Sequence, residues 1–203
     1  MRANLLIDSL PDTVEVDGRE FSINSDFRAG VLFEMLIYDD EVRSEAKIEQ
    51  MFEIYFGESQ NVPKTKEAID AVLAFYRCEK RENRAAQRLV KRTDGGQRTK
   101  RIYDFECDDA YIYAAFLSEY GIDLNSVEYL HWWKFSAMFS ALGDDRKICK
   151  IMSYRAADLS KIKNKQEKER IARLKVIYAL PHAASKEDKV AHAASVFSGG
   201  LKQ

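Results

Sequence analysis

Cysteine is scarce in this chain, and its few cysteines form no pattern typical of a metal site or a disulfide framework. Cys78, Cys107 and Cys149 are spread over 203 residues, and no Cys-x-x-Cys pair occurs. An odd number of distant cysteines is not the framework of a small secreted domain. No histidine stands at zinc-ligand spacing from any of them. We therefore expect reduced thiols and a cytoplasmic protein.

Glycine and proline are also few, at 9 and 3 residues. No apolar run reaches the roughly 18 residues of a membrane helix, so no membrane partner is expected. Few turn residues and many Ala, Leu, Lys and Glu residues favour helices over a β fold with many turns. We predict a mainly α protein, with a single helical domain over residues 1–180, an N-terminal β-hairpin and a basic internal loop. A weakly ordered C-terminal helix and tail should follow over residues 181–203.

Known catalytic motifs are absent as well. The sequence has no phosphate-binding loop, dinucleotide fingerprint, nucleophile elbow or His-Glu-x-x-His motif. An acidic run, Asp104, Glu106, Asp108 and Asp109, lacks the glycine and glutamate of an EF-hand loop, and no base or nucleophile completes a two-metal site. We interpret the run as acids at a helix start, where the helix dipole favours them. We expect no enzyme activity, no metal and no cofactor.

Charge is balanced overall but distributed unevenly. The net charge is −1, yet residues 1–76 have 7 basic and 16 acidic side chains, whereas residues 77–101 have 10 basic and 3 acidic ones. The basic segment has few large apolar residues and a Gly-Gly pair, which predicts a mobile loop over about residues 88–102. Its candidate partner-binding residues are Arg88, Lys91, Arg92, Arg98, Lys100 and Arg101.

The basic segment over residues 77–101 has three interpretations. It is a solvated helix end and loop, a docking strip for an acidic protein surface, or a nucleic-acid site. Single-stranded nucleic-acid sites interleave basic with aromatic residues, and this segment has no aromatic residue. The pI near 6.3 is also low for such a binder. The sequence therefore disfavours nucleic acid as the partner.

Local signals predict the N-terminal elements. Residues 13–24 alternate apolar and polar side chains around an Asp-Gly dipeptide, which predicts a β-hairpin with one face on the helices. Asp26 can cap a helix that ends near residue 39, and Gly57 can end a second helix over about residues 44–56. Pro63 can open a third helix over about residues 64–79.

The stretch from Tyr103 to Arg155 contains both tryptophans and should form the core. Helical spacing of apolar residues up to Gly121 predicts one helix, and Asn125 or Ser126 can cap a second. Apolar residues cover nearly every face of this second helix, so it should be buried on most sides.

In that second helix, His131 is predicted to be a hydrogen-bonded core histidine and not a general base. Later helices are predicted over residues 146–154, 159–179 and 185–197. In the helix over 159–179 we expect Ile171, Leu174, Ile177 and Tyr178 to pack inward.

The same central stretch is similar to a known family. The similarity lies in five short motifs, Tyr103-Asp-Phe-Glu, Asp108-Asp109-Ala-Tyr111-Ile-Tyr113-Ala-Ala-Phe116, Tyr120-Gly-Ile-Asp-Leu124, Leu130-His-Trp-Trp-Lys-Phe135 and Ile151-Met-Ser-Tyr-Arg155. They resemble a family of small proteins of siphophages and prophages of Gram-positive bacteria. Members of that family are encoded in the tail module shortly before the tape-measure gene.

The resemblance implies a tail assembly chaperone in the host bacterial cytoplasm. Such a chaperone would coat the long, coiled-coil-prone tape-measure protein and release it as tail-tube subunits polymerise around it. The implied partners are the tape-measure protein, the tail-tube protein and further copies of the chain in a homo-oligomer. There are two alternatives: the protein is a structural component of the finished tail, or it binds nucleic acid through residues 77–101. No residue role is implied, because the matched motifs are mostly apolar and aromatic.

Overall fold

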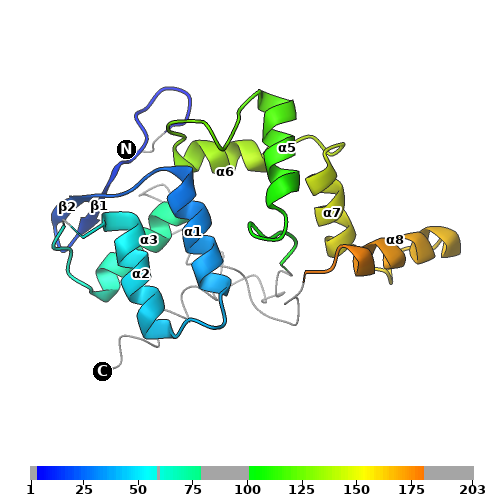
Figure 1. The fold of residues 1–203 in the computed structure, drawn as a ribbon, viewed down its shortest axis with the longest axis horizontal. Coiled ribbons are helices and arrows are strands. Elements are labelled where there is room, and N and C mark those ends of the chain that lie inside the picture. The colour runs from blue at the N-terminus through cyan, green and yellow to red at the C-terminus, as the bar shows by residue number, and fades with distance from the viewer. Residues whose placement is uncertain (1–3, 59, 79–100, 181–203) are drawn as a thin grey trace. The chain divides into compact units, whose positions relative to one another are not determined.

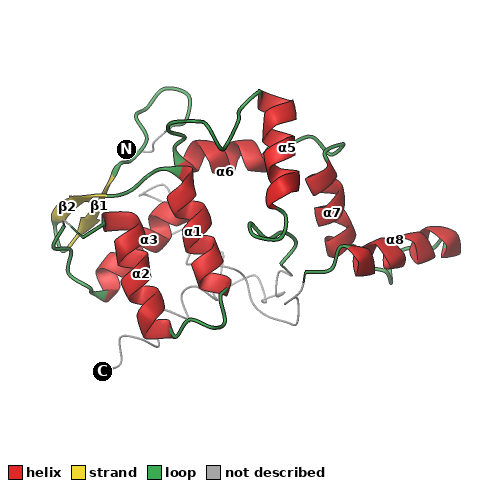
Figure 2. Ribbon diagram, viewed as in Figure 1, coloured by secondary structure: helices red, strands yellow, loops and turns green. Residues whose placement is uncertain are grey.

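The structure is a computed structural model, and it describes residues 4–58, 60–78 and 101–180. The described residues are mainly helical, with one two-stranded antiparallel hairpin near the N-terminus (Figure 1). Figure 2 shows helices as the prevailing element. The predicted fold class, mainly α with an N-terminal hairpin, is confirmed. The predicted C-terminal helix over residues 185–197 lies outside the described residues.

The described chain groups into two compact units. Unit 1 contains the described part of residues 4–78 together with Tyr129–Ala137, and unit 2 contains residues 101–128 and 138–180. We describe each unit by itself, and one folding domain over residues 1–180 stays a prediction.

The hairpin of unit 1 forms where the sequence predicts it. Strands β1 (Thr13–Val16) and β2 (Arg19–Ser22) pair in antiparallel register. Asp17 and Gly18 both have positive φ, 51° and 75°, which is the conformation that a two-residue hairpin of this twist requires. Val16 on β1 is 1% exposed, and helix α3 packs against this strand.

Three helices complete most of unit 1. They are α1 (Phe27–Tyr38), α2 (Ser44–Phe56) and α3 (Lys66–Tyr76). The Asp26 carboxylate accepts a hydrogen bond from the Arg28 amide at 2.9 Å, so the predicted cap of α1 is confirmed. The predicted ends of α2 are confirmed, and Gly57 follows it with φ 65°. Helix α3 begins two residues later than predicted, because Thr65 caps it by accepting from the Ala68 amide.

The C-terminal end of α1 is capped by a buried lysine. Lys47 on α2 is 4% exposed, and its Nζ donates to the Ile37 carbonyl at 2.8 Å. This carbonyl belongs to the last turn of α1, where a positive charge is favourable. Burial lowers the pKa of Lys47, and the nearby carboxylates of Asp40 and Asp39 oppose that shift.

Unit 2 contains α5 (Asp109–Tyr120), α7 (Lys147–Ala156) and α8 (Lys165–Ile177). Helix α5 ends at Gly121, which has a left-handed conformation as the sequence predicted. Helix α7 packs against α5 and α8. The best buried side chains of this unit are Phe116, Ile148 and Ile151, each 0% exposed.

Helix α6 (Trp132–Ser140) begins later than predicted. The start near Asn125 or Ser126 is wrong, because the chain before Trp132 is extended and pairs with the segment before α1. The Trp132 amide donates to the Ser25 carbonyl at 2.7 Å, and the Leu130 carbonyl accepts from the Phe27 amide at 2.8 Å. The prediction that α6 is buried on nearly every side is also wrong, since Lys134, Ala137 and Ser140 are exposed.

Helix α8 is shorter than predicted. It begins at Lys165, where the Asn164 side chain accepts from the Glu167 amide at 3.0 Å. Ile171 is buried, but the predicted inward position of Ile177 is wrong, since this side chain is 62% exposed. Positions three, four and seven residues after Ile171 share its face, and position 177 does not.

Candidate functional site

His131 connects the loop before α6 to the N-terminal segment of unit 1. It is 4% exposed, and its Nδ1 accepts from the Trp133 amide at 3.0 Å while its Nε2 lies 3.1 Å from the Pro11 carbonyl. An Nδ1 that accepts carries no proton, so Nε2 bears the proton and donates to Pro11. The predicted hydrogen-bonded core histidine is confirmed.

Burial of His131 leads to a prediction about pH. Burial lowers its pKa below the ordinary 6.5, and the Pro11 carbonyl opposes that shift. The unfolded chain therefore binds more protons than the folded chain as pH falls below 6.5, and the free energy of unfolding of unit 1 should fall with it. Above 6.5 this contribution is complete.

The measurement is denaturant unfolding across the acidic range, followed by tryptophan fluorescence. His131→Asn keeps an acceptor for the Trp133 amide and does not titrate, so its stability should depend less steeply on pH. An equal pH dependence in the variant would contradict the assignment to His131.

The tryptophan pair caps the C-terminal end of α3. Trp132 Nε1 donates to the Tyr76 carbonyl at 2.7 Å, and Trp133 Nε1 donates to the Phe75 carbonyl at 2.9 Å. These carbonyls are in the last turn of α3, where carbonyls lack the usual helical donor, and the Phe75 carbonyl also accepts from the Cys78 amide at 3.0 Å. The Trp132 ring also stacks on the Tyr76 ring, with centroids 5.3 Å apart. Both tryptophans are buried, which confirms the predicted core role.

Trp132 packs directly on the α1 backbone at Gly30. A Cβ atom at Gly30 would overlap the indole ring, with Trp132 Cζ3 at 2.6 Å. We expect Gly30→Ala to destabilise unit 1 by about 1–3 kcal/mol, because the overpacking outweighs the better helix propensity of alanine. Chemical denaturation measures this, with Leu32→Ala on the exposed side of α1 as a control that should change stability by about 0.5 kcal/mol or less. A stabilised Gly30→Ala variant would contradict the close contact.

Unit 2 contains a buried ion pair, Asp108 with Arg155. Arg155 Nη1 and Nη2 donate to the two Asp108 carboxylate oxygens at 2.5 and 3.0 Å. The side chains are 8% exposed for Arg155 and 1% for Asp108. The guanidinium also donates to the carbonyls of Tyr178, at 2.6 Å, and Ile102, at 3.0 Å. Arg155 therefore connects the segment before α5, helix α7 and the chain after α8.

Asp104 organises the segment that precedes α5. Its Oδ1 accepts from the amides of Glu106 and Cys107 at 2.7 and 2.9 Å, and its other oxygen forms an ion pair with Arg101. The acidic run lies at a helix start as predicted, since Asp108 is the N-cap residue of α5 and Asp109 is in its first turn. The sequence did not predict that Asp104 and Asp108 are buried. The sequence contained a signal that one of these acids is buried. Arg155 continues the apolar stripe of Ile148 and Ile151, and a charged side chain on a buried stripe needs a partner of opposite charge.

Most predicted partner-binding residues fall outside the described residues. These are Arg88, Lys91, Arg92, Arg98 and Lys100. Arg101 is described, and its side chain is 19% exposed and pairs with Asp104. The predicted mobile loop over residues 88–102 likewise lies almost entirely outside the described residues.

The three cysteines form no disulfide. Burial raises the pKa of the Cys78 thiol to about 11, and the Ser136 side chain opposes that shift. A thiol with this pKa is protonated near neutral pH and is a poor nucleophile.

Within residues 4–58, 60–78 and 101–180, no group of three or more His, Cys, Asp or Glu side chains is placed to hold a metal ion. In the same part of the chain, no helix combines the length and the apolar run needed to cross a membrane. Exposed apolar side chains are a different kind of candidate, because they can mark a contact surface.

An apolar turn stands out near the N-terminus. Leu5, Leu6 and Ile7 are 43%, 89% and 81% exposed. The turn is held by its flanking residues, since the Asp8 carboxylate accepts from the Asn4 amide at 2.8 Å and the Asn4 carbonyl accepts from the Asp8 amide at 2.9 Å. These bonds present three large apolar side chains together on the surface of unit 1.

A family model described as bacteriophage Gp15 protein matches residues 6–180. The chain belongs to this family. The Gp15 match spans the described parts of both units and includes all five motifs in which the sequence resembled a phage family. This confirms the coarser part of the prediction, that the chain belongs to a bacteriophage protein family. No curated protein and no solved structure matches the chain.

The motifs of this Gp15-family chain serve its scaffold. His131, Trp132 and Trp133 join the α6 start to the rest of unit 1, and Asp108 and Arg155 join the segments of unit 2. Their polar atoms bind one another or the backbone, and the residues are buried. These groups are therefore structural.

Proposed function

We propose that this Gp15-family protein is a tail assembly chaperone that binds the tape-measure protein of its phage. It acts in the host bacterial cytoplasm, without catalysing a reaction and without a cofactor. Membership of a bacteriophage protein family is the observation that carries the proposal. The resemblance of the central motifs to tail-module proteins encoded before the tape-measure gene supplies the specific role, by analogy.

The apolar turn Leu5-Leu6-Ile7 is the contact surface that we assign to this role. A coiled-coil-prone chain has an apolar seam that must be covered to stay soluble. Exposed Leu and Ile side chains on a short turn can pack against such a seam. The turn is presented by a well-packed unit, so binding does not require the chaperone to unfold.

The direct test is co-expression with the tape-measure protein of the same phage genome, followed by pull-down and assay of the soluble fraction. We expect a soluble complex with the unaltered chain. Leu6→Asp together with Ile7→Asp should reduce the recovered tape-measure protein at least about tenfold, because two charges enter the apolar contact. Both side chains are highly exposed, so the variant should fold normally.

Leu32→Asp is the matched control. This leucine is 53% exposed on α1 of the same unit, away from the turn in sequence, and its replacement should leave the complex intact. If the well-folded chain neither binds nor solubilises the tape-measure protein, the chaperone role is wrong. Mass spectrometry of purified virions then tests the alternative, a structural tail component, which predicts that the chain persists in finished particles.

A further inference from the structure

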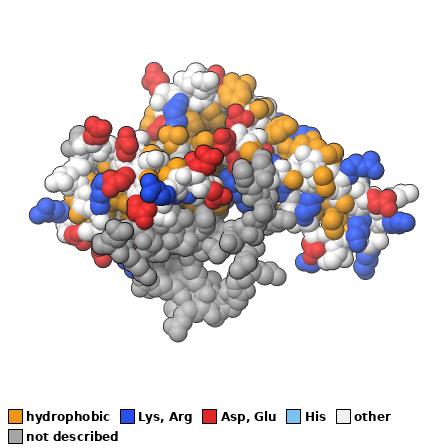
Figure 3. Space-filling view, turned by 60° about the horizontal axis from the view of Figure 1, so that its bottom comes forward, with side chains coloured by type: hydrophobic (Ala, Val, Ile, Leu, Met, Phe, Trp, Pro, Cys, Tyr) orange, Lys and Arg blue, Asp and Glu red, His pale blue; other side chains and the backbone are white. Residues whose placement is uncertain are grey.

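Unit 1 is acidic, and one segment of unit 2 is strongly basic. The described residues of unit 1 include 8 basic and 16 acidic side chains, whereas residues 146–175 of unit 2 include 11 basic and 3 acidic ones. The net charge is −8 for the described part of unit 1 and +8 for this segment, whereas the described residues of unit 2 as a whole have 12 basic and 12 acidic side chains. In the space-filling view, Lys and Arg side chains gather around α8, at the right-hand end (Figure 3). Such separation favours association between unlike surfaces.

The acidic charge of unit 1 includes a stripe along α2. Glu45, Glu49 and Glu53 are spaced four residues apart and are all exposed, and we call them the acidic face. Glu49 pairs with Lys64, while Glu45 and Glu53 have no ion-pair partner among the residues that the structure describes. Like charges four residues apart in a helix repel each other. Two of the three glutamates of the acidic face therefore lack an ion-pair partner among the described residues of their own unit.

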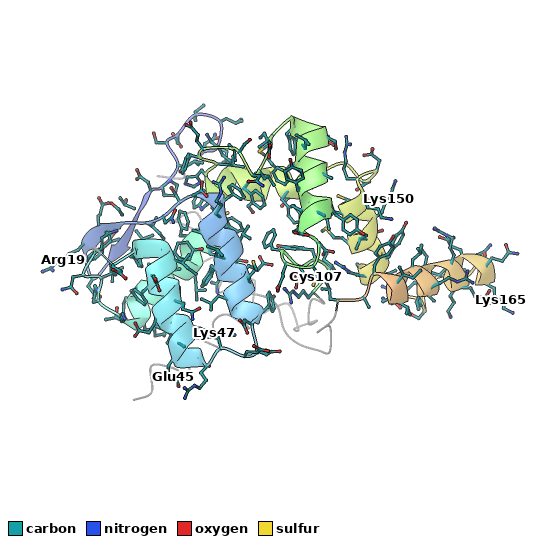
Figure 4. The ribbon with its side chains drawn as sticks, viewed as in Figure 1. Arg19, Glu45, Lys47, Cys107, Lys150 and Lys165 are labelled. Atoms are coloured by element: carbon teal, nitrogen blue, oxygen red, sulfur yellow. The ribbon has the colours of Figure 1, made fainter. Side chains whose placement is uncertain are left out.

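The basic charge of unit 2 is placed unfavourably for its own helix. Lys165 and Lys168 lie in the first two turns of α8, where the helix dipole repels positive charge. Figure 4 labels Lys165 at the start of α8 and Glu45 near the start of α2. Together with Arg173, these two lysines are exposed, and we call them the basic face.

The same helix ends in two exposed apolar side chains. Val176 is 77% exposed and Ile177 is 62% exposed. Exposed apolar groups next to basic ones favour a protein partner, because burying the apolar area adds to the charge attraction.

We propose that the basic face of α8 in one copy of the chain binds the acidic face of α2 in a second copy. Each copy has one acidic face and one basic face, and the acidic face of one copy contacts the basic face of the next. The contact is therefore head to tail. Such a contact propagates into a closed ring or an open filament, depending on the rotation between copies. A nucleic acid or an anionic membrane would satisfy the basic face alone and leave the acidic face uncompensated. The proposal is independent of the tape-measure role.

Charge reversal of each face tests the contact. Glu45→Lys with Glu53→Lys alters the acidic face, and Lys165→Glu with Arg173→Glu alters the basic face. Sedimentation velocity over a range of concentrations should show self-association of the unaltered chain, weaker at high salt. Each double variant should weaken the apparent association at least about tenfold, since attraction becomes repulsion.

The chain that carries all four substitutions is the decisive variant, because its two faces are complementary again with exchanged signs. Its self-association should recover, which also shows that the separate variants lost a contact and not their fold. Glu20→Lys with Asp70→Lys is the matched control. It makes the same net charge change at two exposed acids outside α2, and it should change the association by about twofold or less.

Several results would overturn the proposal. The proposal is wrong if the wild-type chain stays monomeric at every concentration, or if the face variants leave its self-association unchanged. It is also wrong if the chain with all four substitutions folds but does not recover self-association. If the control variant weakens association as much as the face variants do, the association depends on net charge in general and not on these two faces. Loss of binding to DNA or to anionic phospholipid vesicles in the basic-face variant, with self-association unaffected, would assign the face to those ligands instead.

Discussion

Replacing Asp108 with alanine is expected to destabilise unit 2 by about 3–5 kcal/mol, because it leaves the Arg155 guanidinium buried without its counter-charge. Asp108 accepts two hydrogen bonds from Arg155 and a third from the Asp104 amide. The measurement is denaturant unfolding followed by far-UV circular dichroism. Amide hydrogen exchange in α7 localises the effect, since unit 2 has no tryptophan.

Asp109→Ala is the matched control for Asp108→Ala. The neighbouring carboxylate is exposed and in the first turn of α5, so its loss should cost about 1 kcal/mol or less. Removing both members of the pair, with Asp108→Ala and Arg155→Met, should destabilise less than the sum of the single substitutions, because no uncompensated charge remains. Equal effects of the Asp108 and Asp109 substitutions would contradict a buried ion pair.

Replacing Trp132 with alanine is expected to destabilise unit 1 by about 3–5 kcal/mol, the range for loss of a buried tryptophan. The substitution removes the stacking on Tyr76 and on Phe135, at centroid distances of 5.3 and 5.7 Å. It also deprives the Tyr76 carbonyl of its indole donor. Trp133 remains as a fluorescent reporter of the same unit, so fluorescence-detected unfolding measures the change.

Two further variants separate the causes of the Trp132 effect. Trp132→Phe keeps an aromatic ring but removes the indole N–H, and it should cost about 1–3 kcal/mol for the lost hydrogen bond to the Tyr76 carbonyl and for the smaller ring. Lys134→Ala, on the exposed side of the same helix, should change stability by about 0.5 kcal/mol or less. If Trp132→Ala behaves like Lys134→Ala, the tryptophan does not hold α6 to α3.

The tryptophan cap and the ion pair show why part of the scaffold was not predictable. Trp132 and Tyr76 are 56 residues apart, and Arg155 and Asp108 are 47 residues apart. Periodicity and capping rules act within a few residues and cannot pair positions at such distances. Burial of the tryptophans was predictable from their apolar neighbours, but their function as donors to α3 was not.

The candidate contact surfaces were missed for a similar reason. Leu6 and Ile7 are apolar, and the sequence alone does not say that the chain exposes them. Ile177 was expected to pack inward, but it is exposed. Which apolar residues of α8 point toward the rest of unit 2 depends on their position around the helix relative to the buried Ile171. The acidic face of α2, by contrast, could have been read from three glutamates four residues apart, since the helix itself was predicted correctly.

Local sequence signals were enough to predict the fold class, the Asp17-Gly18 hairpin turn, the Asp26 cap of α1 and the stops at Gly57 and Gly121. Each depends on backbone preferences and hydrogen bonds between near neighbours. The start of α6 and the buried ion pair of Asp108 became apparent only from the folded chain. Those features depend on backbone pairing and desolvated charge between segments that come together only when the chain folds.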